Sequence, residues 1–254
     1  MKKMSISVVL ATHNEEINLP DCLKSVKDLA DEIIVVDGRS TDRTVEMAKT
    51  FNAKVYVVPN QKNFHINKQK AIDKATKDWI LQLDADERVT PELAAEITKK
   101  INDSESVNGY WIPRKNWFLG RYLMKGGVYP DYTLRLYKKN KGKLPQKDVH
   151  EQAVVEGEVG FLKSPLIHFA DPSFSRYINR FDRYTTFIAG QLHEQKTRQN
   201  PLNLLKYLVA LPLYWFVLQY GRHKGFMDGW QGFVFAFFSA LRFPVSYIKY
   251  IKKI

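Results

Sequence analysis

Three carboxylates follow an apolar run in the segment Trp79–Glu87, which reads Trp-Ile-Leu-Gln-Leu-Asp-Ala-Asp-Glu. Such a run is typical of a buried strand, and open α/β sheets bind ligands beyond the carboxyl ends of their strands. Asp84 and Asp86 point the same way on an extended backbone, whereas a turn at Asp84 spreads them around one ligand. Close carboxylates repel one another unless a cation compensates them, and a divalent ion carrying a phosphate does this. The alternative is a strand end before a helix that opens at Thr90–Glu92.

Two more polar loops follow apolar runs, Thr12–Glu16 after residues 6–11 and Asp37–Asp42 after residues 32–37. The first 90 residues alternate predicted strands (6–11, 32–37, 54–58, 79–83) with predicted helices (19–29, 42–51, 65–76). Asn18 is expected to cap the first helix, and Ser40 or Thr41 the second. This alternation predicts a mostly parallel sheet with helices on both faces. The three polar loops then gather at one edge of the sheet, where nucleotides bind.

The residues at this edge suit a nucleotide diphosphate. Asp37 can accept a hydrogen bond from the imide N–H of uracil, and Lys68 can pair with the base or a phosphate. Asp86 can ligate a metal that bridges the diphosphate. The residues expected near the ribose and base are Thr12, Asn14 and Glu15. No Walker loop or G-x-G-x-x-G follows the first strand, which argues against kinases, ATPases and dinucleotide dehydrogenases.

Length and charge bound the remaining possibilities. The chain has 254 residues, enough for one large α/β domain or a domain with an appendage, and a net charge of +12. That charge indicates an anionic partner. The single cysteine, Cys22, excludes an intrachain disulfide and fits a reducing compartment. The N-terminus does not read as a signal peptide, because polar residues interrupt its apolar run early.

After residue 100 further strands are expected at 109–113, 133–137 and 152–155, so that the sheet becomes mixed. The C-terminal part is different again. Residues 204–220 and 226–250 are mostly apolar, are flanked by tryptophans and tyrosines, and have basic residues between and beyond them. Asp228 is their only acid. Both are marginal as membrane spans, and helices lying in the membrane interface fit better. The alternative is a helical pair packed on protein.

The chain resembles family 2 glycosyltransferases, which have the GT-A fold. The matching residues are Ser7–Glu15, Ile34–Asp42 and Trp79–Glu87, whose order and spacing are specific and cover roughly the first 100 residues. The later segments Thr133–Tyr137, Val149–Glu151 and Gly225–Gly232 resemble, less specifically, bacterial lipopolysaccharide core β-1,4-glucosyltransferases.

The resemblance implies an inverting transfer from a nucleotide-diphospho-sugar, often UDP-linked. It implies that the acid at Asp37 contacts the base. Asp84 and Asp86 then form a D-x-D motif, in which Asp86 holds Mg²⁺ or Mn²⁺. His168 is a candidate further metal ligand or diphosphate contact, and its alternative is a structural role. Arg135 is expected to bind the diphosphate or to pair with Asp131.

Transfer to a hydroxyl needs a general base. Glu151 and Asp148 compete for this role, and alternation along a strand lets only one enter the site. Glu151 is favoured because it matches the Val-His-Glu motif of the subgroup. The alternative for both is a solvated loop.

The sequence therefore predicts a bacterial enzyme with a GT-A catalytic domain over residues 1–200 and a membrane-associating helical extension over 201–254. The expected acceptor is a lipid-anchored saccharide such as lipopolysaccharide core. The expected location is cytoplasmic, peripheral to the inner membrane and on an anionic surface. One alternative is a polyprenyl-phosphate glycosyltransferase, whose anionic acceptor needs no general base. A nucleotidyltransferase would need a glycine-rich basic loop after the first strand. A non-catalytic basic membrane-binding module is another alternative, and nucleic acid is not expected because acids crowd the ligand edge.

Overall fold

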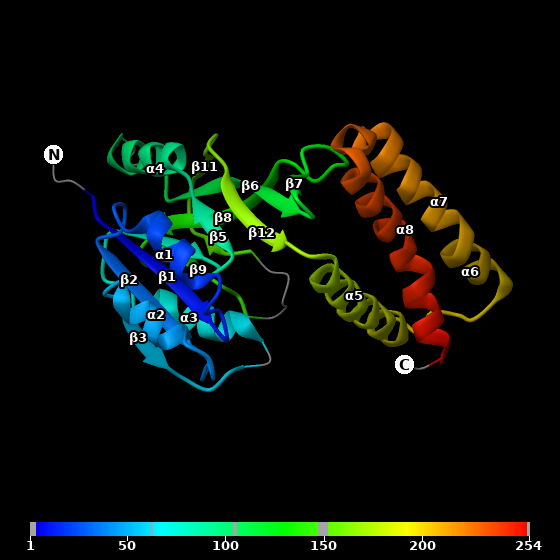
Figure 1. The fold of residues 1–254 in the computed structure, drawn as a ribbon, viewed down its shortest axis with the longest axis horizontal. Coiled ribbons are helices and arrows are strands. Elements are labelled where there is room, and N and C mark those ends of the chain that lie inside the picture. Colours follow the sequence, from blue (N-terminus) through cyan, green and yellow to red (C-terminus); the bar gives the residue numbers. More distant parts are fainter. Residues whose placement is uncertain (1–3, 62, 104–105, 147–151, 253–254) are drawn as a thin grey trace. The chain divides into compact units, whose positions relative to one another are not determined.

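The computed structural model describes residues 4–61, 63–103, 106–146 and 152–252. The chain forms two compact units (Figure 1). The first, here the sheet unit, comprises Met1–Arg114 and Asp131–His168, and the second, here the helical unit, comprises Lys115–Pro130 and Phe169–Ile254. The expected domain boundary at residue 200 stays a prediction.

Four parallel strands form the first half of the sheet, in the order β3-β2-β1-β4. They are β1 (Ile6–Thr12), β2 (Glu32–Asp37), β3 (Lys54–Val57) and β4 (Trp79–Leu83). Thr12 lies opposite Asp37, and Leu10 lies opposite Leu83. The three strands β1, β2 and β4 therefore end at the same edge, as the polar loops after them predict.

The second half of the sheet is mixed and continues from β4 in the order β8-β6-β12-β5. Its strands are β8 (Asp131–Lys138), β6 (Gly109–Phe118), β12 (Leu166–Asp171) and β5 (Glu87–Val89), with β7 (Arg121–Tyr122) and β11 (Val159–Phe161) paired to β6. A separate pair joins β9 (Gly142–Lys143) and β10 (Val154–Val155). The predicted change to a mixed sheet after residue 100 is confirmed.

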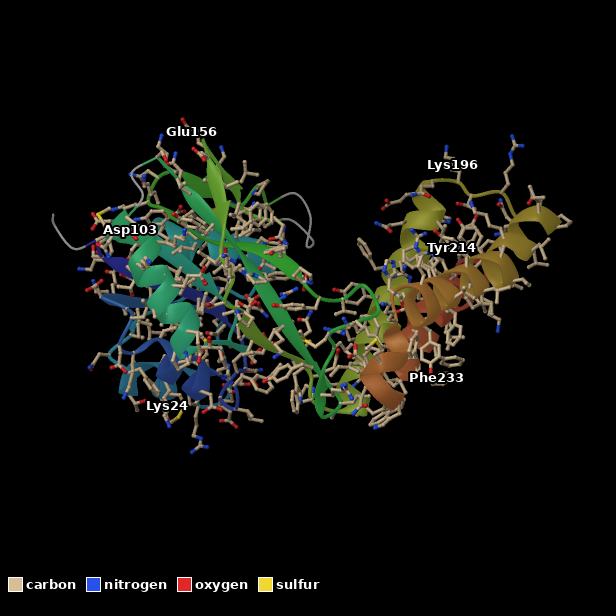
Figure 2. The ribbon with its side chains drawn as sticks, turned by 90° about the horizontal axis from the view of Figure 1, so that it is seen from above. Lys24, Asp103, Glu156, Lys196, Tyr214 and Phe233 are labelled. Carbon is tan, nitrogen blue, oxygen red and sulfur yellow. The ribbon has the colours of Figure 1, made fainter. Side chains whose placement is uncertain are left out.

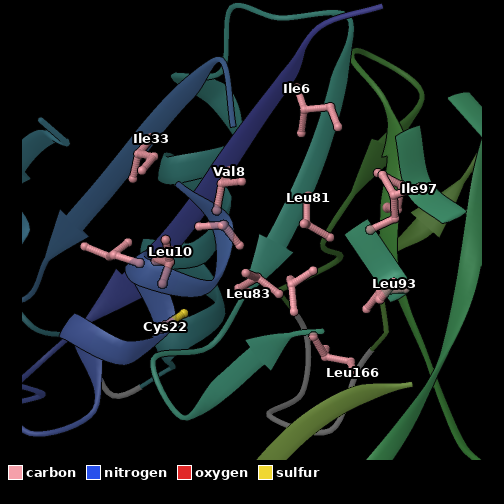
Figure 3. Packing of buried hydrophobic residues seen from close by; sticks show 14 of the residues in the cluster. Ile6, Val8, Leu10, Cys22, Ile33, Leu81, Leu83, Leu93, Ile97 and Leu166 are labelled. Atoms are coloured by element: carbon pink, nitrogen blue, oxygen red, sulfur yellow. The ribbon is translucent and has the colours of Figure 1, made fainter. Parts of the chain in front are cut away.

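Helices cover both faces of β1, β2 and β4, whose buried residues are mostly apolar. Val8 and Leu10 face α1 (Leu19–Val26), α2 (Thr44–Thr50) and α4 (Pro91–Asp103) in one buried cluster. Figure 3 shows these two residues packed with Cys22, Leu81 and Leu83. Val9 lies in a second cluster with α3 (Phe64–Asp73). Successive residues of β1 thus enter opposite clusters, as the period of a strand requires.

The helical unit is built on three long helical segments. The first is α5 (Phe174–Glu194), which the sequence analysis does not predict. The second is continuous over Pro201–Arg222 and consists of α6 (Pro201–Leu205), η1 (Lys206–Ala210), α7 (Leu211–Phe216) and η2 (Val217–Arg222). The third is a short turn η3 (Gly225–Asp228) followed by α8 (Gly229–Lys252). The two predicted C-terminal helices are therefore present, each a few residues longer than expected.

One predicted helix start is wrong. The helix expected over 42–51 begins at Thr44, and neither Ser40 nor Thr41 caps it. The Asp42 carboxylate instead accepts a hydrogen bond from the Thr44 backbone N–H at 3.0 Å. The Ser40 hydroxyl donates to the Asp37 carboxylate at 2.5 Å, so this serine serves the loop after β2 and not the helix.

Candidate active site

Asp37 is a fully buried carboxylate at the end of β2. It accepts hydrogen bonds from the Ser40 backbone N–H at 2.8 Å, from the Ser40 hydroxyl at 2.5 Å and from the Thr12 hydroxyl at 3.1 Å. Because these donors fix both oxygens, the carboxylate has one defined orientation at the strand edge. The predicted residues Thr12 and Asp37 are thus brought together, and Thr12 acts on Asp37 directly.

The loop after β1 is bound to the loop after β2. The Asn14 backbone, at a φ of 56°, donates to the Ser40 hydroxyl at 2.8 Å, and its side-chain oxygen accepts from Thr41 N–H at 2.8 Å. The Glu15 backbone N–H donates to the Thr44 hydroxyl at 2.7 Å. Asn14 and Glu15 therefore lie at the same edge as Asp37. The described contacts of the Asn14 side chain hold the loop, and its direct contact with a nucleotide stays a prediction.

The chain turns directly after β4, so the second of the two predicted geometries for Asp84 and Asp86 is the one found. The Glu87 backbone N–H donates to the Asp84 carbonyl at 3.0 Å and closes this turn. The guanidinium of Arg88 donates to the Ala85 carbonyl at 2.7 Å and to the Asn18 carbonyl at 2.9 Å, which ties the turn to the start of α1. The turn is therefore fixed on both sides.

Two buried cations meet on the Asp84 carboxylate. Lys68, from α3, forms an ion pair with Oδ1, and Arg135 Nη2, from β8, lies 2.6 Å from Oδ2. Burial by itself raises the pKa of Asp84, but the charges of Arg135 and Lys68 outweigh it and hold this pKa well below its usual range. For Arg135 burial acts to lower the pKa, and Asp84 and Glu87 more than reverse that effect. Asp84 is therefore ionised and Arg135 charged at neutral pH.

Glu87, the third carboxylate of the run after β4, is a site residue whose role is not predicted from the sequence. It is fully buried, its Oε1 lies 3.2 Å from Arg135 Nη2 and 3.5 Å from Arg114 Nη1, and its Oε2 accepts from the Asp84 N–H at 2.9 Å. The pairing of Arg135 with Asp131, one of the two expectations for that arginine, is wrong. Asp131 lies 2.7 Å from Arg114 instead.

Asp86 and His168 come together at the pairing of β5 with β12. His168 lies opposite Glu87 in this antiparallel pair, and its Nε2 is 3.7 Å from Asp86 Oδ1. Carboxylate oxygens are the ligands that Mg²⁺ and Mn²⁺ prefer, and proteins hold Mg²⁺ with one or two such groups plus substrate phosphates. Within the described residues no group of three or more His, Cys, Asp or Glu could hold a metal. The two donors therefore fit a metal that a diphosphate completes.

The two candidate bases, Asp148 and Glu151, lie outside the described residues. Their roles stay predictions. The other predicted site residues all belong to the sheet unit, at the carboxyl ends of β1, β2 and β4 or on the α3, β8 and β12 segments beside them.

The chain is similar to known glycosyltransferases over most of its length. Curated relatives include the lipopolysaccharide core biosynthesis glycosyltransferase LpsC of Rhizobium meliloti, 28% identical over 94% of this chain and 92% of its own length. An uncharacterized glycosyltransferase of Rickettsia typhi is 29% identical over 95% of this chain and 86% of its own. The crystal structure of S. aureus TarS covers 99% of this chain and 92% of its own, with a TM-score of 0.50 at 16% identity.

The overall likeness to TarS extends beyond the first 100 residues that carry the sequence motifs and confirms the predicted GT-A fold. The C-terminal helices, predicted as amphipathic, are present and are mostly apolar. The family model for glycosyl transferase family 2 matches residues 7–167, which include every described residue of the candidate site except His168. This chain is a glycosyltransferase and belongs to glycosyl transferase family 2.

Proposed function

We propose that this enzyme transfers a hexose, with inversion, from a UDP-linked sugar to a hydroxyl of a lipid-anchored saccharide such as lipopolysaccharide core. Membership of the family supports transfer from a nucleotide-diphospho-sugar. The name of LpsC, which matches over nearly the whole chain, supports the saccharide of a lipopolysaccharide core as acceptor. The location that suits such an acceptor is the cytoplasmic face of the inner membrane.

One observation carries the donor site: Lys68 and Arg135 meet on Asp84 at the sheet edge that also holds the buried Asp37. Asp37 is oriented to accept the imide N–H of a uracil base. The two cations supply positive charge where the diphosphate of the donor must lie. A preorganised charge of this kind stabilises the diphosphate as it leaves, because the cations need no reorganisation during the reaction.

A divalent cation, Mg²⁺ or Mn²⁺, would be held by Asp86 and His168. When bound, it neutralises part of the charge on the leaving diphosphate. Asp84 has a separate role, because its carboxylate is occupied by Lys68 and Arg135. It holds both cations in place and keeps them charged.

The acceptor hydroxyl loses its proton as its oxygen attacks the anomeric carbon of the sugar. Glu151 is the proposed base that takes this proton, with Asp148 as the competing candidate. Departure of the nucleoside diphosphate on the opposite side of that carbon accounts for inversion.

Calorimetric titration with UDP, GDP and CDP, each with and without Mn²⁺, tests the donor site. Metal-dependent binding of UDP that is lost in Asp37→Ala and in Asp86→Ala is the expected result. Asp28→Ala is a matched control, because Asp28 is an exposed acid of the sheet unit away from the strand edge. Binding of GDP alone would redirect the donor to GDP-linked sugars, and the absence of any nucleotide binding would overturn the proposal.

A further inference from the structure

The outer helical segment Pro201–Arg222 exposes apolar side chains along its whole length. It is long and apolar enough to cross a membrane by length and composition, and none of its most hydropathic stretch is buried. Five of its exposed apolar residues recur every three or four positions and so share one face, Leu202, Leu205, Val209, Leu213 and Val217. Leu204 and Tyr214 are exposed as well. A face of this extent is more than scattered surface hydrophobicity and indicates a docking surface.

The second apolar helix, α8, has one free apolar face as well. Its exposed residues Trp230, Phe233, Phe237, Ile248 and Ile251 follow helical spacing. Elsewhere α8 packs on its neighbours: Phe238 contacts Phe181 of α5, and Phe243 stacks on Trp215 of α7. Figure 2 shows Tyr214 and Phe233 on this pair of helices. Tyrosine and tryptophan, which these helices expose at Tyr214 and Trp230, favour the interface between water and lipid.

The charge of the protein is concentrated in this unit. The helical unit contains 15 lysines and arginines and 4 acids, so it accounts for 11 of the 12 net positive charges of the chain. Three of the four acids are engaged with other groups: Asp171 pairs with Arg180, Asp182 with Lys249, and Asp228 accepts two backbone N–H groups. The surface of the helical unit is therefore strongly basic, and the sheet unit is nearly neutral.

The packing of α5 decides between spanning the membrane and lying on it. Lys249 of α8 donates to the Asp182 carboxylate at 2.6 Å and to the Thr186 hydroxyl at 2.8 Å, so α5 runs against α8 with charged groups between them. Arg176, Arg180 and Arg183 also belong to α5. A spanning α8 would carry these charges into hydrocarbon, which is costly. The pair of helices therefore suits a position in the membrane interface.

We propose that the helical unit docks on an anionic phospholipid surface through the exposed apolar faces of Pro201–Arg222 and α8. The exposed cations Lys206, Arg222 and Lys224 then meet lipid phosphates. This inference rests on the membrane location in the proposed function. It adds that negatively charged lipid recruits the enzyme. A second copy of the chain is a poorer occupant, because pairing would bring the same positive residues together.

Flotation with lipid vesicles tests the apolar part of the surface. The full chain is expected to float with vesicles rich in phosphatidylglycerol and not with phosphatidylcholine alone, and its binding should weaken as salt is added. Val217→Glu should reduce the partition coefficient at least tenfold, because a valine leaves the lipid. Val154→Glu is the matched control: Val154 lies in the sheet unit and is 54% exposed, against 56% for Val217.

Charge neutralisation tests the basic part of the surface. Lys206, Arg222 and Lys224 changed together to Gln should weaken binding to anionic vesicles roughly 100-fold, since each basic residue near such a surface contributes about fivefold. The control changes Lys24, Lys27 and Lys49 to Gln, which removes the same net charge from exposed positions of the sheet unit. If both triple variants lost vesicle binding equally, the binding would depend only on net charge, and the proposed surface would be overturned.

Two further outcomes would also overturn it. One is equal binding to neutral and anionic vesicles. The other is no vesicle binding, together with a dimer in sedimentation equilibrium that Val217→Glu dissociates. A protein that binds UDP with Mn²⁺ and ignores vesicles would overturn only the membrane surface, whereas vesicle binding without nucleotide binding would overturn only the proposed function.

Discussion

Arg135 Nη2 lies 2.6 Å from Asp84 Oδ2, and the same nitrogen lies 3.2 Å from Glu87 Oε1. One guanidinium from β8 therefore joins the first and last residues of the turn that follows β4. Asp86, between them in sequence, lies beside His168. The carboxylates that look equivalent in the sequence thus divide into two that anchor cations and one, Asp86, that lies beside His168 and is the proposed metal ligand.

This division predicts different results for two similar substitutions. Asp84→Asn should lower the free energy of unfolding by about 3–5 kcal/mol, because two buried cations lose their shared anion. Asp86→Asn should change it by less than about 1 kcal/mol, and should abolish metal-dependent UDP binding. Urea denaturation of both variants, with calorimetry of UDP and Mn²⁺, measures the contrast.

Equal destabilisation by the two substitutions would contradict the separate roles of Asp84 and Asp86. Asp28→Asn serves as a control for removal of a negative charge from the exposed surface of the sheet unit.

Glu87→Gln tests a positioning role for Glu87. The neutral side chain keeps the shape of the acid but weakens its interactions with Arg114 and Arg135, which hold the turn in place. We expect weaker Mn²⁺-dependent UDP binding, by tenfold or more, and a higher KM for the donor with a smaller change in kcat. Unchanged donor affinity with a loss of stability alone would reduce Glu87 to a structural residue.

Much of the sheet unit is predictable from sequence because its signals are local. Trp79–Leu83 is apolar except for the buried Gln82, and β4 has these bounds. The gathering of Thr12, Asp37 and Asp84 at one edge follows from parallel strands alone. In contrast, β5 has only three residues and exists through its pairing with β12, about 80 residues later in the chain, so no local pattern indicates it.

The ion-pair partners in the site also escape sequence reasoning. Arg135 is close in sequence to Asp131, yet four residues of extended strand separate them by about 13 Å. Arg114 of β6 lies opposite Asp131 in the pairing of β6 with β8 and takes that acid instead. The partners of Arg135 come from the turn after β4, some 50 residues earlier. The buried Glu87 could be suspected only from the run of acids at the strand end. Ion pairs between residues so far apart in the sequence depend on tertiary packing.

Glu151→Gln separates the two acceptor chemistries. Transfer to a hydroxyl should lose roughly 10²–10⁴-fold in kcat, because the base that takes the acceptor proton is removed, while UDP affinity stays unchanged. Asp148→Asn is the paired variant and should have a much smaller effect. Rates measured with a saccharide acceptor and with a polyprenyl phosphate complete the test. The polyprenyl-phosphate alternative would be favoured if Glu151→Gln were fully active on polyprenyl phosphate. In that case neither the wild type nor the variant would act on the saccharide.

Glu32 lies at the opposite end of β2 from Asp37, about 17 Å away along the strand. Its carboxyl predicts how the stability of the fold depends on pH in the acid range. Burial acts to raise the pKa of Glu32, but Lys54 at 2.7 Å, Ser7 at 2.6 Å and Thr76 outweigh it and lower this pKa to about 2. A carboxyl whose pKa is lower in the folded state stabilises the fold above its unfolded pKa, near 4.5. This stabilisation, about 3 kcal/mol, is lost as the pH falls from that value towards 2.

Glu32→Gln should therefore be less stable than the wild type at about pH 6, and the difference should shrink at about pH 3. The amide cannot ionise, so the variant lacks this part of the acid dependence and still keeps a hydrogen-bonding side chain. Urea midpoints at both pH values measure it, with Glu46→Gln, an exposed acid of α2, as the control. A stability gap that is the same at both pH values would show that Glu32 acts through packing and not through its charge. Because Asp37 and the strand edge lie far from the change, UDP binding at neutral pH should be unaltered.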